Sequence, residues 1–181
     1  MAQQGQYVGE SVLGTIVENV GLGQVLYCTG VGSIPTPIDP FGSKGVWRVA
    51  SANGTYFDPE SYVVGGWISG QNQLGIALEA ATASPLSITQ SGVQIPILLS
   101  GYYSPGQLNF GGYCNGNLNN GSPIYLMPNS TGATNSTGCV DGFKPTHYGA
   151  TQGVYRVVGY AYDLVYPYII RFEPDKTWIE I

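Results

Sequence analysis

Charged residues are scarce in this 181-residue chain. Asp, Glu, Lys and Arg make up 9% of it, against about a quarter of a typical soluble domain. The six basic residues are scattered and the formal net charge is −5, which argues against a nucleic-acid partner held by a basic patch. A surface with few charges repels its neighbours weakly. We therefore expect much of it to be covered by copies of the chain or by a partner; the alternative is a soluble β protein that depends on hydroxyl and amide side chains.

Long hydrophobic runs and a secretory signal are also missing. No apolar stretch approaches the roughly 18 residues of a membrane-spanning helix, so no membrane partner is expected. Residues 1–6 have neither the basic nor the apolar region of a signal peptide, which favours synthesis in a cytosol. Residues 1–9 are predicted to form a polar arm that either reaches a neighbouring subunit or is disordered.

Cysteine and histidine are too few to build a recognisable site. Cys28, Cys114 and Cys139 match no zinc spacing and are expected to be small buried apolar residues. A Cys114–Cys139 bridge is the alternative. His147 is the only histidine, and no Gly-x-Ser-x-Gly motif accompanies it, so a solvent-exposed loop histidine is expected.

Paired acids offer no better case for catalysis. Asp58 with Glu60, and Glu173 with Asp175, each bracket a proline turn, where acids normally accept backbone hydrogen bonds. Neither a phosphate-binding glycine loop nor a calcium loop is present. The sequence therefore predicts no catalytic residues, no cofactor, no metal and no enzyme activity.

What the chain has in abundance is glycine (27), proline (12) and tyrosine (14). Short segments rich in β-branched and aromatic residues alternate with turn signals, which predicts an all-β antiparallel sandwich or barrel. Residues 10–181 are expected to form one domain, with sub-units 10–110 and 111–181 as an alternative division. Ile76–Ala83 alone has some helical character. The predicted strands are Ser11–Val20, Gln24–Thr29, Val46–Ala52, Thr55–Phe57, Tyr62–Ile68, Leu74–Ala81, Leu86–Gln90, Val93–Ser100, Leu108–Tyr113, Ile124–Met127 and three in the last 29 residues.

Two short matches suggest an internal repeat. Gly23–Tyr27 resembles Gly121–Tyr125, and Gly45–Val49 resembles Gly153–Val157 in the same order. Either the chain contains two related β units that share a core, or glycine-flanked strands simply look alike.

Two arginines lie within apolar strands at matching places of these segments. Arg48 and Arg156 are expected to face solvent by ordinary strand alternation. The alternative is that they pair with acids such as Glu79 and Asp163 and fix strand register.

The last 29 residues, Gly153–Ile181, are predicted to form three successive strands, Val154–Asp163, Tyr168–Phe172 and Thr177–Ile181. The final strand is expected to pack against Ile169–Phe172 and to bury one face, so that loss of Trp178 destabilises the fold. The alternative is an exposed handle for a partner.

This closing segment resembles the closing β module of small virion proteins of tailed bacteriophages, found in capsid decoration (cement) proteins and in tail-fibre proteins. A weaker resemblance covers Gly75–Ala81 and Ile97–Tyr102. The resemblance implies a virion structural protein on the capsid surface, a homotrimer whose partner is the major capsid protein of the head shell. It brings no catalytic residues. The residues that carry it are Arg156, Val157, Gly159, Ala161, Phe172, Pro174, Asp175, Thr177, Trp178 and Glu180.

The alternative implied by the same resemblance is a tail-fibre or receptor-binding protein that recognises a host surface glycan. Aromatic side chains would then stack on sugar rings, whereas their ordinary role is packing in the core. The candidates for stacking are Tyr102, Tyr103, Tyr113, Trp67 and Trp47.

Overall fold

The computed structural model describes residues 5–16, 18–28, 46–52, 55–57, 64–68, 73–82, 93–105, 118–127, 138–148, 153–165 and 168–180. Within these segments the regular structure consists of β-strands and one 3-10 helix, Pro145–Tyr148, so the predicted all-β class is confirmed. The strands are β1 (Tyr7–Ile16), β2 (Val25–Cys28), β3 (Val46–Val49), β4 (Thr55–Phe57), β5 (Val64–Ile68), β6 (Leu74–Ala77), β7 (Val93–Tyr103), β8 (Pro123–Leu126), β9 (Val140–Asp141), β10 (Val154–Tyr155), β11 (Val157–Asp163), β12 (Ile169–Phe172) and β13 (Ile179–Glu180).

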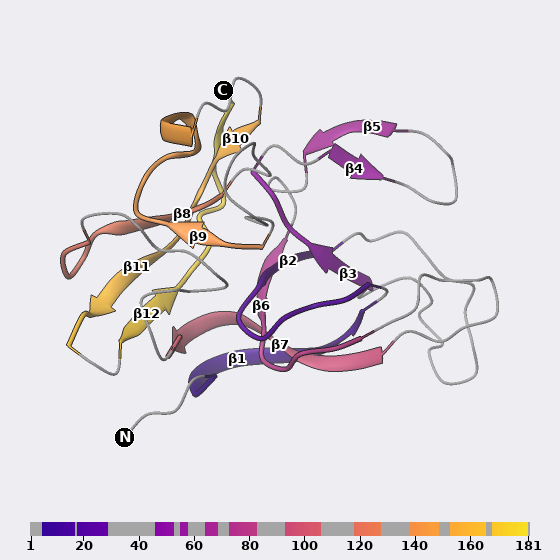
Figure 1. The fold of residues 1–181 in the computed structure, drawn as a ribbon, viewed down its shortest axis with the longest axis horizontal. Helices are drawn as coiled ribbons and strands as arrows, with labels where there is room; N and C mark the ends of the chain where they lie inside the picture. Colours follow the sequence, from indigo (N-terminus) through magenta and orange to yellow (C-terminus); the bar gives the residue numbers. More distant parts are fainter. Residues whose placement is uncertain are drawn as a thin grey trace.

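Five strands close on one another into a small barrel (Figure 1). Hydrogen bonding runs in the order β1-β3-β2-β6-β7, and β7 pairs again with β1 to complete the ring. Every pair in the ring is antiparallel except β1 with β3, where Thr15 and Ile16 lie beside Val46 and Trp47. This parallel pair arises because β2 reverses the chain and β3 reverses it again. The sheet is therefore mixed, which corrects the purely antiparallel arrangement predicted from the sequence.

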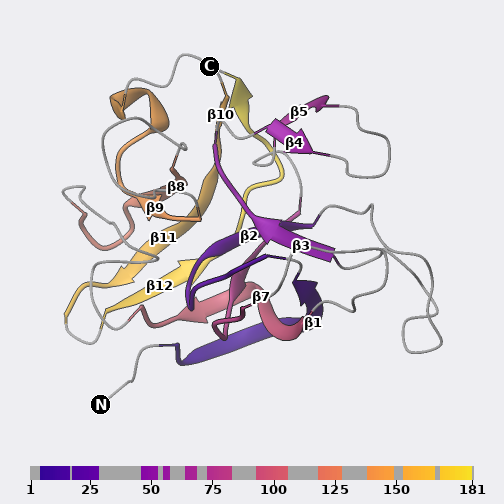
Figure 2. The ribbon, with the colours of Figure 1, turned by 45° about the vertical axis from the view of Figure 1, so that its right-hand side comes forward.

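The barrel is filled by side chains from alternate strand positions. On β2, Leu26 points into the barrel, whereas Val25 and Tyr27 belong to a cluster on the other side of the sheet. This division follows from the two-residue period of a strand. In Figure 2, β3 lies above β1 and β7 and forms one wall of the barrel. The barrel core contains Ile16, Val20, Leu26, Trp47, Ala77, Ala81, Ile95 and Ile97.

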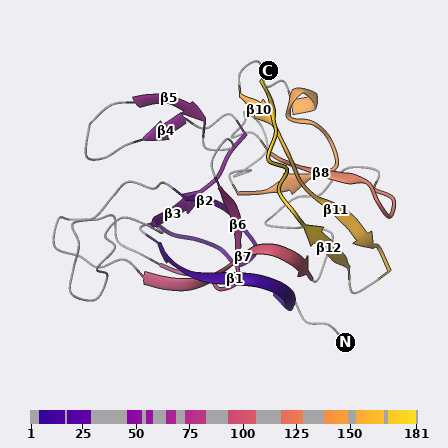
Figure 3. The same ribbon diagram turned by 180° about the vertical axis from the view of Figure 1, so that it is seen from behind.

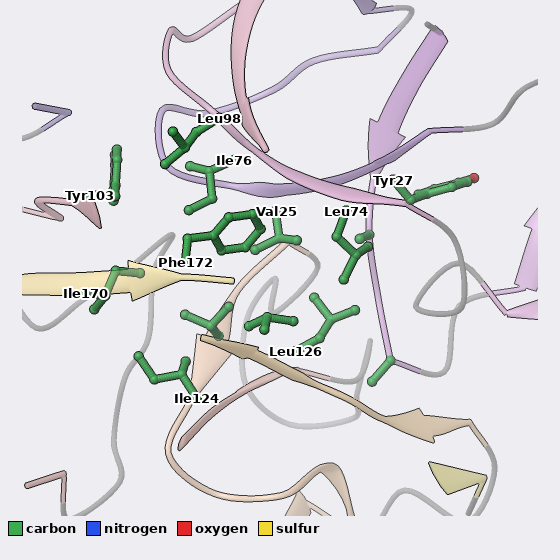
Figure 4. Close-up of a cluster of buried hydrophobic side chains, with 14 of the residues drawn as sticks. Val25, Tyr27, Leu74, Ile76, Leu98, Tyr103, Ile124, Leu126, Ile170 and Phe172 are labelled. Carbon is green, nitrogen blue, oxygen red and sulfur yellow. The ribbon is translucent and has the colours of Figure 1, made fainter. Parts of the chain in front are cut away.

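A second layer continues the sheet from β7. Residues 101–103 of β7 pair with β12, and the sheet then runs β12-β11-β8-β9 (Figure 3). The larger apolar cluster lies between this layer and the barrel, with Phe172 at its centre (Figure 4). Around Phe172 lie Val25, Ile76 and Leu98 from the barrel strands, and Ile124, Leu126 and Ile170 from the second layer.

Two three-stranded parts of the sheet share their order and register. The units β2-β6-β7 and β8-β11-β12 are both antiparallel throughout. Leu26 pairs with Gly75 in the first unit, and Ile124 pairs with Gly159 at the corresponding place in the second. The second unit differs by a bulge between Val157 and Gly159. The sheet therefore contains two equivalent arrangements of three strands.

The turns that lead into these units also match. The backbone N–H of Gly23 donates to the carbonyl of Ala77 at 2.8 Å, and that of Gly121 donates to Ala161 at 2.6 Å. In return, the N–H of Ala77 donates to the carbonyl of Gln24, and the N–H of Ala161 donates to the carbonyl of Ser122. The first of the two sequence matches therefore coincides with equivalent backbone hydrogen bonding.

The second sequence match, Gly45–Val49 with Gly153–Val157, does not coincide with equivalent strand pairing. Gly45–Val49 contributes β3, which pairs with β2 in the barrel, whereas β10 pairs with β13 outside the nine-stranded sheet. The strand equivalent to β6, Leu74–Ala77, is Val158–Ala161 in β11. The repeat therefore contains a Gly-x-Ala segment, and the proposed equivalence of Gly45–Val49 and Gly153–Val157 was wrong.

The N-terminal boundary differs from the prediction. Residues 5–9 do not form a detached arm, because Gly5 N–H donates to the carbonyl of Ser104 at 2.9 Å and β1 begins at Tyr7. β1 pairs with β7 over its whole length. The helical character of Ile76–Ala83 is also not expressed, since β6 occupies its start and a bend follows. Of the predicted strands, Leu86–Gln90 and Leu108–Tyr113 lie outside the described residues.

The C-terminal strand is placed differently from the expectation. β13 pairs with β10, with Tyr155 beside Ile179, and it does not pair with β12. Residues 177–180 are all exposed, and Trp178 retains 38% of its surface. The predicted burial of one face of this strand was therefore wrong, because the turn after Phe172 carries the chain past β12.

Replacing Trp178 with alanine is therefore expected to lower stability by only about 1–2 kcal/mol, the range of a cation–π contact between a partly exposed ring and a buried cation. Trp178 packs on the Arg156 guanidinium, whose central carbon lies 5.8 Å from the ring centre. The matched control is Trp47→Ala, because Trp47 is buried in the barrel and its loss should cost about 3–5 kcal/mol. Thermal unfolding measures both, and equal losses would contradict the placement of Trp178.

Candidate functional site

A row of exposed or half-buried side chains crosses four neighbouring strands. Val8 on β1 lies beside Tyr102 on β7, Tyr102 beside Arg171 on β12, and Arg171 beside Tyr160 on β11. Residues paired across strands point to the same side of a sheet. The row therefore lies on one face, opposite to the side that packs on the barrel.

The opposite side of the same strands is buried. Tyr103, Ile170 and Ala161 are next to the row in sequence and pair with one another across the sheet. All three are nearly inaccessible to solvent. Burial raises the pKa of the Tyr103 hydroxyl to about 12, so this tyrosine stays protonated in the core at neutral pH. Alternation thus separates a packing side from an exposed side.

Two contacts extend the exposed row. The rings of Tyr102 and Tyr162 meet edge to face, with centroids 4.8 Å apart and planes at 65°. Arg171 and Glu173 form an ion pair at 2.7 Å, with both side chains about half exposed. We call the set Tyr102, Tyr160, Tyr162, Arg171 and Glu173 the open face.

A shallow hollow of about 510 Å³ borders the open face at Tyr102. It lies where the start of β1 meets the end of β7. The hydroxyl of Ser104 in its wall donates to the carbonyl of Tyr168 at 3.0 Å, which ties the end of β7 to the start of β12. The hollow is lined by Gly5, Gln6, Tyr7, Val8, Tyr102, Tyr103, Ser104 and Ile169.

The strand β1 carries a second exposed surface. Every residue from Tyr7 to Leu13 is exposed although the strand pairs fully with β7. Val8 is 73% exposed and Leu13 70%, and strand alternation places them on opposite faces. Apart from the parallel contact of Thr15 and Ile16 with β3, the outer edge of β1 pairs with no other strand of the described part. We call residues 7–13 the β1 surface.

The aromatic residues predicted to stack on sugars fall into two groups. Trp47 and Tyr103 are buried, at 2% and 1% exposure, so neither is available to a ligand. Tyr102 is 37% exposed and belongs to the open face. Tyr113 and the side chain of Trp67 lie outside the described residues.

Sequence reasoning missed most of the open face. Tyr160, Tyr162 and Arg171 were not among the candidates, although Tyr160-Ala161-Tyr162 alternates in the manner of a strand with one buried side. That alternation was the available signal. It could not show which side was exposed, because this depends on the layer packed against β11.

Both predicted arginines have partners other than those proposed. Arg48 is partly buried and lies 3.7 Å from the Glu18 carboxylate, whose other oxygen accepts the N–H of Val49 at 2.5 Å. Arg156 is buried, and its Nε donates to the carbonyl of Asp175 at 2.5 Å. The expectation of a solvent-facing side chain was therefore wrong for Arg156. Arg48 stays partly exposed and pairs with an acid, as in the alternative, but the acid is Glu18.

Arg156 lies beneath the C-terminal segment that follows the turn. Burial lowers the pKa of its guanidinium, and the neighbouring Asp175 carboxylate opposes this by raising it. Asp175 also donates its N–H to the carbonyl of Val157 at 2.9 Å. Arg156 thus fastens the turn after β12 to β11, which is a structural role. Asp163 accepts the N–H of Val165 and holds a local turn instead of pairing with Arg156.

The remaining polar candidates show no convergent cluster. The carboxylate of Glu173 forms an ion pair with Arg171, whereas it was expected to accept a backbone hydrogen bond at its proline turn. His147 lies in the 3-10 helix, but its side chain is not among those that the structure describes. Asp58 and Glu60 lie outside the described residues. In that part, no three His, Cys, Asp or Glu side chains are arranged to hold a metal ion.

The cysteine prediction is tested in part. Cys139 is buried and Cys28 partly buried, as expected of small apolar residues. Burial raises the pKa of the Cys139 thiol to about 11, which keeps it protonated and poorly nucleophilic at neutral pH. Cys114 lies outside the described residues, so the alternative of a Cys114–Cys139 bridge stays a prediction.

No protein-family model, curated protein or solved structure matches this chain significantly. Among the described residues, no helix has the length and apolar character needed to cross a bilayer. The exposed surfaces on β1 and on the open face are therefore the features from which function is inferred.

Proposed function

We propose that this chain is a structural protein of a tailed-bacteriophage virion, of the capsid decoration type, which binds and stabilises the assembled head shell. Its proposed partners are the major capsid protein and further copies of the chain in a homotrimer. The resemblance of Gly153–Ile181 to the closing module of such proteins supports this class, as does the scarcity of charge.

The observation that carries the proposal is the β1 surface. Val8, Val12 and Leu13 are exposed in residues 7–13 of β1, where the side chains on both faces of the strand are exposed. Over these residues the outer edge of β1 pairs with no other strand of the described part, and an exposed apolar strand edge is a surface on which another chain can pair. Glu10 is the one charged residue of β1, which limits the desolvation cost of covering it.

The mechanism is stabilisation by mass action. A protein that binds the assembled shell, and binds its separate subunits more weakly, shifts the equilibrium toward the assembled state. Attachment across a junction between capsid subunits would add interface area there. No chemical step is needed for this activity.

The test is where the protein appears on intact particles and which surface attaches it. A labelled antibody is expected on the head, and purified protein should co-sediment with particles assembled without it. Val8→Lys and Leu13→Lys should each weaken co-sedimentation roughly tenfold or more, because a lysine charge must be desolvated at the interface. Their melting curves should stay close to that of the wild type.

Ile179→Lys is the matched control, because Ile179 is also an exposed apolar residue of a strand edge, at 54%, and lies on β13 near the C-terminus. It should bind particles normally. Loss of binding with this variant alone would move attachment to the C-terminal strand. Label at the tail tip, or on no part of the particle, would overturn the proposed class.

A further inference from the structure

We propose that the open face binds a neutral oligosaccharide, whose rings stack on Tyr102 and Tyr162 and whose hydroxyl groups hydrogen-bond with the Arg171–Glu173 pair. This inference goes beyond attachment to a head shell and does not depend on it. The open face and the β1 surface are formed by different side chains but meet at Val8, which lies beside Tyr102 and lines the hollow. The two proposals are therefore tested separately, one on particles and one on the free protein.

The two tyrosines form a corner that suits a sugar ring. Because their planes meet at 65° with centroids 4.8 Å apart, a ring lying flat on one of them touches the edge of the other. Tyr162 is 55% exposed and Tyr102 retains a free part of its ring. Pyranose rings present flat patches of C–H groups, which pack on aromatic faces, and each tyrosine hydroxyl adds a polar contact at the rim.

The charged pair beside the tyrosines determines the charge of the ligand. Arg171 and Glu173 contact each other at 2.7 Å and remain about half exposed. Their charges cancel, so the open face attracts neither an anion nor a cation strongly. The guanidinium still offers N–H donors and the carboxylate still offers acceptor oxygens. Vicinal hydroxyl groups of a neutral sugar satisfy both.

The dimensions of the face favour an oligosaccharide over a single sugar. The row from Tyr102 through Arg171 to Tyr160 crosses three strands, a width of about 10 Å at the usual spacing. The hollow of about 510 Å³ continues from Tyr102 and is bordered by the polar side chains of Gln6 and Ser104. A chain of two or three sugar rings fits this length.

A protein partner fits the open face less well. Protein interfaces have an apolar centre and a polar rim, and although tyrosine and arginine are enriched in them, glutamate is depleted. Here the centre of the row is Arg171, a charged residue already paired with Glu173. Covering it would require desolvation of an ion pair, whereas a sugar leaves much of the pair in water.

The experiment titrates the purified full chain with maltotriose, cellotriose and chitotriose, followed by saturation-transfer NMR and calorimetry. At least one trisaccharide is expected to bind in the millimolar range or tighter, with signal transfer to tyrosine rings. Tyr102→Ala and Tyr162→Ala should each weaken binding roughly tenfold, and Arg171→Gln should weaken it by a smaller factor. Trp178→Ala is the matched control, since it removes an exposed aromatic ring outside the open face.

Three outcomes would overturn the proposal. None of the three sugars binds at 10 mM, or binding is unchanged in both tyrosine variants, or the tyrosine variants instead change the oligomeric state seen by light scattering. The last outcome would identify the open face as a contact between copies of the chain. Because head attachment is read on particles and sugar binding on the free protein, failure of one proposal is distinguishable from failure of the other.

Discussion

Replacing Gly101 with alanine is expected to destabilise the fold by about 3 kcal/mol or more. Gly101 has a φ of +137° and pairs with Gly9 across β1 and β7. A Cβ at Gly101 would lie 2.2 Å from the carbonyl oxygen of Val8. Because that atom belongs to the backbone, only a shift of β1 could relieve the overlap. Since β1 closes the barrel, the whole fold should respond, and chemical denaturation with circular dichroism measures the loss.

Gly121→Ala separates the two causes of that loss. Gly121 also has a left-handed φ, +85°, but nothing lies within 4 Å of the place its Cβ would occupy. Its replacement should therefore cost only the backbone term, about 1–2 kcal/mol. If Gly101→Ala and Gly121→Ala lose the same stability, the close approach of β1 and β7 at this point is wrong.

Replacing Phe172 with alanine is expected to cost about 3–5 kcal/mol, the range for a fully buried phenylalanine. Phe172 has no exposed surface and packs between both layers, against side chains of β2, β6 and β8 (Figure 4). Its loss leaves a cavity that neither layer can fill without giving up its own strand pairing. Domains are stable by only about 5–15 kcal/mol, so the melting temperature should fall steeply.

The matched control for Phe172 is Tyr162→Ala. Tyr162 is an aromatic residue of the same second layer but is more than half exposed. Its replacement should change the free energy of unfolding by no more than about 1 kcal/mol, since it loses one ring contact and little burial. A larger loss at Tyr162 than at Phe172 would reverse the assignment of the buried and exposed sides of the second layer.

Part of the candidate site could be predicted from the sequence. Tyr102 became a candidate for stacking on sugars through the alternative that the family resemblance implies, and the structure places it at the surface. The same reasoning failed for Trp47 and Tyr103, which are buried. Residue type does not distinguish these cases, because a strand carries equivalent side chains on both sides and the packed layer decides which side is covered.

The ion pair on the open face also shows that local sequence does not determine which residues come together in the site. Arg171 and Glu173 are two residues apart in a predicted strand and turn, so their positions on one face follow from local geometry. Their neighbours Tyr102 and Tyr160 come from segments about 70 and 11 residues away in the chain. Strand pairing alone brings them together, and no local pattern contains that information.

The sequence by itself determined the all-β class and the positions of most of the described strands. Short β-branched and aromatic segments between glycine and proline turns carry that information locally, because backbone propensity and alternation act within a few residues. Tertiary structure decided that β1 closes a barrel, that Arg156 is buried and that Trp178 is exposed. These outcomes depend on which strands pair and in what register, and a shift of one residue turns every side chain of a strand to the other face.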